Sequence, residues 1–111
     1  MKLHAHCPST EYSEKFLQLM LDHMGVSYYK YGKVSDAFPE KVNALHSLLD
    51  RIRKYESTGN TEYLVDVANF AMIEFMRPSH KEAHFTPTDS DGSPGRRWRD
   101  KKQPTQQGNK S

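Results

Sequence analysis

The sequence predicts an all-α protein, a small bundle of three main helices with a disordered C-terminal tail. Three segments of the 111-residue chain repeat their apolar residues at the spacing of one helical face, and short polar turns separate them. The aromatic segment 26–32 has no second strand to pair with, so we expect it to be an irregular or helical extension. We place the helical bundle domain at residues 1–84 and the tail at residues 85–111.

The first helix should begin near Ser9 or Thr10, either of which can cap it. Glu11 and Glu14 then lie in the first turn, where the helix dipole favours acids. Gly25 predicts an end or a kink. Between these signals runs one continuous apolar stripe, made of Phe16, Leu17, Met20, Leu21 and Met24.

The second helix should start at Ser35 or Asp36, because Pro39 is tolerated in a first turn, where its missing N–H has no helical partner. Residues 58–61 supply a helix-ending glycine and a capping Asn or Thr, which predicts a short antiparallel turn. The third helix runs from about residue 61 to Arg77, since Pro78 prevents continuation. The apolar face of the second helix consists of Val42, Leu45, Leu48, Leu49, Ile52 and Tyr55.

Charge and composition divide the chain near residue 84. Residues 1–83 carry ten Lys and Arg against eleven Asp and Glu, whereas residues 84–111 carry six against three. The tail has only Phe85 and Trp98 as large apolar residues, so it cannot bury enough surface to offset its ordering entropy. We therefore expect a folded body followed by a basic arm.

Length and residue usage also limit the class of protein. A chain of this size buries only about 60 to 70% of the surface that its unfolded form exposes, so self-association into a homo-oligomer would help its stability. Cys7 is the only cysteine, no secretion signal is evident, and no stretch approaches the roughly 20 apolar residues of a membrane span. We expect a cytoplasmic protein that is not embedded in a membrane.

The third helical segment carries the candidate site. It is almost wholly apolar, yet Asp66 and Asn69 lie in its middle, and burying even a neutral polar group without a partner costs about 2 to 7 kcal/mol. Glu62, Asp66 and Asn69 share one face, and such oxygen ligands suit a hard cation such as Mg²⁺. Alternatively, Asp66 forms a structural ion pair with Arg51, Arg53 or Lys33 while Asn69 bonds a backbone group. The sequence leaves both interpretations open.

Residues 31–33, 48–56 and 59–71 resemble the spaced pattern of the nucleotide modification associated domain family. More remotely, residues 62–70 are similar to the last metal-binding helix of the all-α MazG-type nucleotide pyrophosphohydrolases. Such proteins are common in phage and bacterial genomes. The resemblance implies magnesium-dependent cleavage of nucleoside triphosphates or a role in nucleotide modification, with Asp66 as a metal ligand and Glu62 as a ligand or its support.

The chain departs from the pyrophosphohydrolase pattern at two ligand positions. The pattern places a glutamate three residues before the aspartate, where this chain has Tyr63, and an acidic pair on the preceding helix, where it has only Asp50. An incomplete carboxylate set cannot hold the metals that neutralise a triphosphate. A binder without catalysis is therefore as consistent with the sequence as an enzyme.

Other candidate groups lie towards the two ends of the chain. His80 and His84, with Asp89, have helical spacing for zinc, and His4, His6 and Cys7 form a second set of metal-capable side chains. In the tail, Arg96 and Arg97 adjoin Trp98, a combination that neutralises phosphate and stacks on a base. The alternatives are solvated histidines and a solubilising arm.

Two functional hypotheses follow. In the first, the protein binds a nucleotide or phosphorylated small molecule beside Glu62, Asp66 and Asn69, and basic groups meet the phosphate: Lys33, Arg51, Arg53, Arg96 and Arg97. In the second, it is a non-enzymatic interaction module of a phage accessory or host-inhibitor type. Such a module would dock on a host or replication protein through its helices or its basic arm, and Asp66 would be structural.

Overall fold

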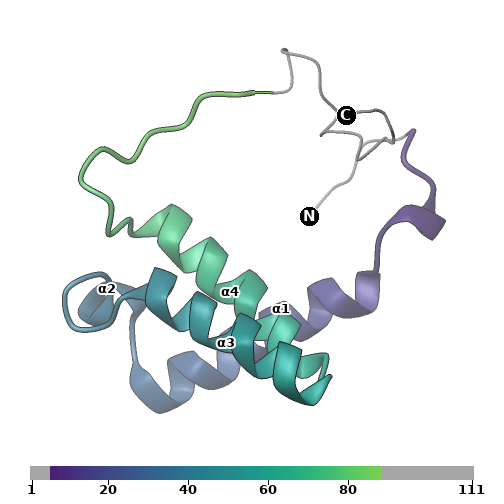
Figure 1. Cartoon of the computed structure of the whole chain (residues 1–111), viewed down its shortest axis with the longest axis horizontal. Coiled ribbons are helices and arrows are strands. Elements are labelled where there is room, and N and C mark those ends of the chain that lie inside the picture. The colour runs from purple at the N-terminus through teal and green to yellow at the C-terminus, as the bar shows by residue number, and fades with distance from the viewer. Residues whose placement is uncertain (1–5, 89–111) are drawn as a thin grey trace.

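The computed structural model describes residues 6–88, and every regular element in that range is helical. The prediction of an all-α fold is therefore confirmed for this part of the chain. A short 3-10 helix, η1, precedes four α-helices of which three are long (Figure 1). Their bounds are η1 Ser9–Glu11, α1 Glu14–Tyr31, α2 Val34–Ala37, α3 Ala44–Thr58 and α4 Glu62–Met76.

Helix α1 begins later and ends later than the sequence predicts. Its N-cap is Ser13, whose Oγ accepts a hydrogen bond from the N–H of Phe16 at 2.9 Å. The helix passes through Gly25 and stops at Gly32, which adopts a φ of 87°. One helical glycine costs only about 1 kcal/mol relative to alanine, so Gly25 weakens the helix without breaking it. The aromatic segment is thus a helical extension.

The predicted second helix is divided in two at Pro39. Helix α2 has only four residues, and Phe38 leaves it in an extended conformation ahead of a cis Phe38–Pro39 peptide bond. The residue before a proline is disfavoured in the helical region, which explains why the helix does not continue through this position. Helix α3 starts afresh after Asn43, whose Oδ1 accepts a hydrogen bond from the N–H of His46 at 3.0 Å.

The connection between α3 and α4 matches the sequence prediction. Gly59 adopts the left-handed conformation with a φ of 73°, and its N–H donates to the carbonyl of Tyr55 at 2.8 Å. Glycine adopts this conformation at no steric cost, so it closes α3. Helix α4 ends at Met76, just ahead of Pro78. The two helices form an antiparallel hairpin (Figure 1).

Helix α4 is the central element, because it packs against both α3 and α1. The core around it is small. Among the described residues only Ala44, Val65 and Ile73 are buried apolar side chains, and Asn69 is the one buried polar residue. Many large apolar side chains are at least one third exposed, among them Leu21, Val26, Tyr28, Tyr29, Tyr31 and Phe75.

The segment that follows α4 carries no helix or strand up to residue 88. It is held to α4 by Glu74, whose carboxylate accepts hydrogen bonds from the N–H and the hydroxyl of Ser79 at 2.8 to 3.2 Å. Most of the predicted tail lies outside the described residues. Within residues 6–88, no helix has the length and apolar character needed to cross a bilayer.

Candidate functional site

Asp66 forms an ion pair with Arg51, one of the three partners that the sequence suggested. The Nε of Arg51 lies 3.2 Å from Oδ2 of Asp66, and its Nη1 lies 2.9 Å from Oδ2 of Asp50. Both members of the Asp66–Arg51 pair are 30% exposed. The guanidinium also lies over the ring of Phe70, 5.6 Å from its centroid. The pair therefore joins α3 to α4 at the edge of the core.

His23 of α1 approaches the same carboxylate from the other side. Its Nδ1 lies 3.5 Å from Oδ1 of Asp66, and its Nε2 lies 3.8 Å from Oε2 of Glu62. Sequence reasoning missed this residue. A signal was present, because His23 stands three residues after Met20 and seven after Phe16, in line with the apolar stripe of α1. Asp66 thus lies between side chains of two other helices, Arg51 of α3 and His23 of α1.

Asn69 connects α4 to α1. Its side chain is buried at 6% exposure, and Nδ2 donates a hydrogen bond to the carbonyl of Met20 at 3.0 Å. Its Oδ1 is buried and accepts no hydrogen bond from any described residue. Asn69 thus bonds a backbone group, as expected if Asp66 and Asn69 stabilise the fold rather than bind a ligand.

The structure describes three of the five basic residues of the ligand hypothesis, and these three make different contacts. Arg51 is engaged by two aspartates. Lys33 is the N-cap of α2 and lines a different cavity, and Arg53 is exposed on α3. Arg96 and Arg97 lie outside the described residues, so their predicted contact with phosphate stays a prediction.

In the described residues, the predicted magnesium ligands Glu62 and Asp66 lie close to side chains of other helices. No group of three or more His, Cys, Asp or Glu side chains within residues 6–88 is arranged to hold a metal ion. The two oxygens of Asp66 face Arg51 and His23, and the side chain of Glu62 is 66% exposed. Asp66 is therefore engaged by side chains of two other helices, and its role as a ligand of Mg²⁺ stays a prediction.

The terminal histidine sets divide between described and undescribed residues. His80 and His84 bond to neighbouring backbone, since Nδ1 of each lies 2.9 Å from a main-chain atom of Glu82. Asp89 and His4 lie outside the described residues. Each predicted zinc-type set thus has a member outside residues 6–88, and both sets stay predictions.

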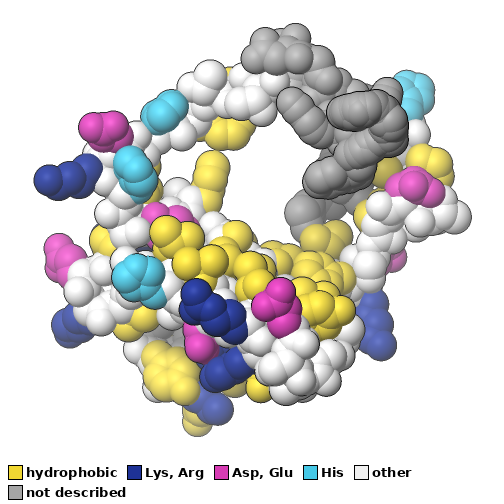
Figure 2. Space-filling model, in the orientation of Figure 1, with side chains coloured by type: hydrophobic (Ala, Val, Ile, Leu, Met, Phe, Trp, Pro, Cys, Tyr) yellow, Lys and Arg dark blue, Asp and Glu magenta, His cyan; other side chains and the backbone are white. Residues whose placement is uncertain are grey.

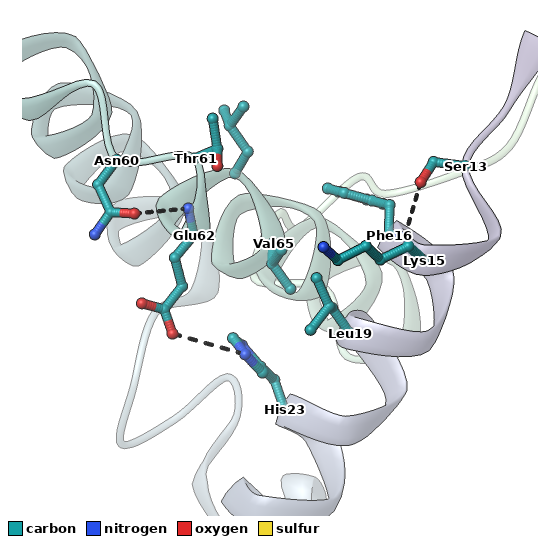
Figure 3. A pocket seen from close by; sticks show the side chains of 10 residues that line it. Ser13, Lys15, Phe16, Leu19, His23, Asn60, Thr61, Glu62 and Val65 are labelled. Atoms are coloured by element: carbon teal, nitrogen blue, oxygen red, sulfur yellow. Dashed lines mark hydrogen bonds and ion pairs between the residues drawn. The ribbon is translucent and has the colours of Figure 1, made fainter.

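A cavity of about 450 Å³ opens next to Glu62, between the start of α1 and the start of α4. Figure 3 shows Lys15, His23 and Glu62 as its charged or titratable lining, with Val65 at its base. Asp66, Asn69 and Arg51 are not among its lining residues. Of the acidic and amide groups predicted to hold a ligand, only Glu62 borders this cavity.

The fold and these contacts define a small helical bundle whose central polar residues join its helices to one another. Comparison of the chain with protein-family models, with curated proteins and with solved structures gives no match.

Asp66→Asn is expected to lower the free energy of unfolding by about 1 kcal/mol in the absence of any ligand, because it removes the charge that pairs with Arg51 in a half-buried position. Urea denaturation followed by circular dichroism measures the change. The exposed Asp22→Asn on α1 is the matched control and should alter the unfolding free energy little. A melting temperature that rises with nucleoside triphosphate and Mg²⁺ in the wild type, but not in Asp66→Asn, would instead favour the ligand hypothesis.

Proposed function

We propose that the protein is a non-enzymatic interaction module that assembles through an uncovered face of α4. This surface, the open face of α4, consists of Leu64, Ala68, Ala71 and Phe75. These residues recur at i, i+4, i+7 and i+11, so they form one stripe along the helix. Phe75 is 73% exposed, Ala71 is exposed, and the other two are half-buried. The exposure of Ala71 and Phe75 along this apolar stripe is the observation that carries the proposal.

The physical basis is the composition of α4. A helix that is apolar on most of its circumference needs cover on every side. Within the described chain, α1 and α3 cover two sides, and the buried Val65, Asn69 and Ile73 lie there. Figure 2 shows hydrophobic side chains in a band over α4 and the adjoining part of α1, with charged side chains along α3. A partner on the open face would complete the core.

The partner that fits this stripe is a second copy of the chain. If two α4 helices pair in antiparallel orientation, Leu64 faces Phe75 of the other copy and Ala68 faces Ala71. Both contacts are then repeated by the two-fold axis, as an isologous interface requires. The two alanines at the centre allow the helix axes to approach closely, while the large residues fill the ends. The predicted host or replication partner would compete for the same surface.

Binding of a nucleotide or phosphorylated small molecule is the second candidate. The cavity beside Glu62 supports it, because Lys15 and His23 stand at its wall and could meet an anion. This version does not depend on Asp66 or Asn69 as ligands. Whether any hydrolysis accompanies binding stays a prediction from the family resemblance.

Ala71→Glu combined with Phe75→Glu is expected to weaken self-association at least tenfold, because each copy would place two carboxylates in the apolar contact. Sedimentation velocity across a concentration series measures the monomer–dimer equilibrium. Val26→Glu, which replaces a 54% exposed apolar residue of α1, is the matched control and should dimerise as the wild type does. A wild type that stays monomeric at millimolar concentration, or a control that dissociates equally, would contradict the proposal.

A further inference from the structure

A second cavity, of about 780 Å³, lies on another side of the bundle from the open face of α4. It is open to solvent on one side and bordered by the C-terminal half of α1, by α2 with the residues that follow it, and by α4. Its size falls within the range of about 300 to 1,000 Å³ that small-molecule sites occupy. Its lining is mostly apolar and includes Met24, Tyr28, Val34, Phe38, Phe70 and Ile73.

Two ammonium groups border this apolar cavity. Lys33 precedes α2 and Lys41 follows it, and both contribute to the lining. Neither forms an ion pair with any of residues 6–88. The acidic residues of the same segment, Asp36 and Glu40, do not line the cavity. An apolar lining with two cations that pair with no acid of residues 6–88 is complementary to a molecule with an aliphatic body and one anionic end.

We propose that this cavity binds a free aliphatic carboxylate of medium chain length. The hydrocarbon chain would replace water against Phe70 and Ile73, and the carboxylate would lie between Lys33 and Lys41. Tyr28 and Tyr31, which are 63% and 77% exposed, stand at the wall and would be covered by the ligand. Burial of the ligand's hydrocarbon chain drives binding, whereas the ammonium groups of Lys33 and Lys41 select an acid over an alcohol of equal length.

The cavity does not require a second copy of the protein. Phe70 and Ile73 lie on the covered side of α4, whereas the stripe made by Leu64, Ala68, Ala71 and Phe75 lies on its open face. The inference therefore goes beyond the proposed assembly function and is independent of it. Gly25 gives a way to close the cavity, because it lines the space and a Cβ built there meets nothing within 4 Å.

The experiment titrates the full chain with octanoate, decanoate and dodecanoate below their micelle concentrations, by isothermal calorimetry. Each added methylene should strengthen binding about fourfold, as full burial of the hydrocarbon chain requires. Lys33→Ala combined with Lys41→Ala should weaken decanoate binding at least tenfold and leave decanol binding unchanged. Lys30→Ala combined with Lys81→Ala removes two exposed lysines that line neither cavity and should match the wild type.

Gly25→Leu tests the location of the site, because the new side chain would fill the cavity while leucine is the better helix former. It should abolish binding of both decanoate and decanol, with the helical circular dichroism retained. No binding of any acid, equal affinity for decanoate and decanol in the wild type, or undiminished binding by Gly25→Leu would each overturn the proposal. Binding to anionic lipid vesicles without binding to free decanoate would also overturn it, in favour of a membrane surface.

Discussion

Asn69→Asp is expected to lower the free energy of unfolding by about 3 kcal/mol or more, because it places a carboxylate where the present side chain is only 6% exposed. The amide now donates to the carbonyl of Met20 at 3.0 Å, whereas an ionised carboxylate there would face a second acceptor. Urea denaturation at neutral pH, followed by far-ultraviolet circular dichroism, measures the loss. The deficit should shrink in acid, where the new carboxyl takes up a proton and regains a donor.

Asn69→Leu is the matched control, since leucine has a similar volume and no polar atoms. It removes the hydrogen bond to Met20, but it also removes the buried Oδ1 that accepts no hydrogen bond from the described chain. The carbonyl of Met20 lies within α1 and keeps its helical hydrogen bond, so no buried acceptor is left unsatisfied and we expect a change within about 1 kcal/mol. A cost equal to that of Asn69→Asp would show that shape, rather than charge, governs this position.

Ile73→Ala is expected to cost about 2 to 4 kcal/mol of unfolding free energy. Ile73 is one of the few buried apolar residues of the described chain, at 5% exposure, and like Phe70 it lines the cavity of about 780 Å³. Removing three carbon atoms loses their transfer free energy and widens a space that the neighbouring helices already leave open. Thermal and urea unfolding of the same samples give the change independently.

A smaller truncation at the same position provides a scale for this loss of unfolding free energy. Ile73→Val removes a single methylene and should cost about 0.5 to 1.5 kcal/mol. Val26→Ala, at a position that is 54% exposed, should cost much less than Ile73→Ala. If Ile73→Ala and Val26→Ala lowered the free energy of unfolding equally, the small buried core would not be what stabilises the bundle.

The elements set by local chemistry could be predicted from the sequence. The hairpin of α3 and α4 follows from Gly59, which takes the left-handed conformation expected of a helix-ending glycine. The end of α4 follows equally from Pro78. These signals act within a few residues of the chain, so they do not depend on knowing which surfaces meet.

The sequence predicts less well those helix ends at which two local signals favour different conformations. Gly25 predicts an end or a kink of α1, and the helix does not end there but continues to Tyr31, because one glycine costs less than the following turns gain. Pro39 was expected inside a first turn, but Phe38 leaves the helical region ahead of it, so α3 starts at Ala44. Both positions admit two local outcomes, and the surrounding chain decides between them.

In the candidate site, too, some contacts could be predicted from the sequence and others depend on how the helices pack. That Asp66 needs a partner followed from its apolar surroundings, and Arg51 was one of the three cations named for it. The selection of Arg51 over Arg53 and Lys33 depends on how α3 is rotated against α4, which the periodicity of one helix does not give. The position of His23 in line with the apolar stripe of α1 indicates that it faces a neighbour, but its contacts with Glu62 and Asp66 depend on where α1 crosses α4.

The order of the helices along the chain has a consequence for the way the protein is made. Helices α3 and α4 are neighbours in sequence, so they can meet as soon as both have left the ribosome. Helix α1 emerges first, yet the hydrogen bond that ties it down joins Met20 to Asn69, 49 residues later. Throughout that interval the apolar stripe of α1 has no native surface to cover it. We therefore expect the nascent chain to bind a chaperone until α4 has been synthesised.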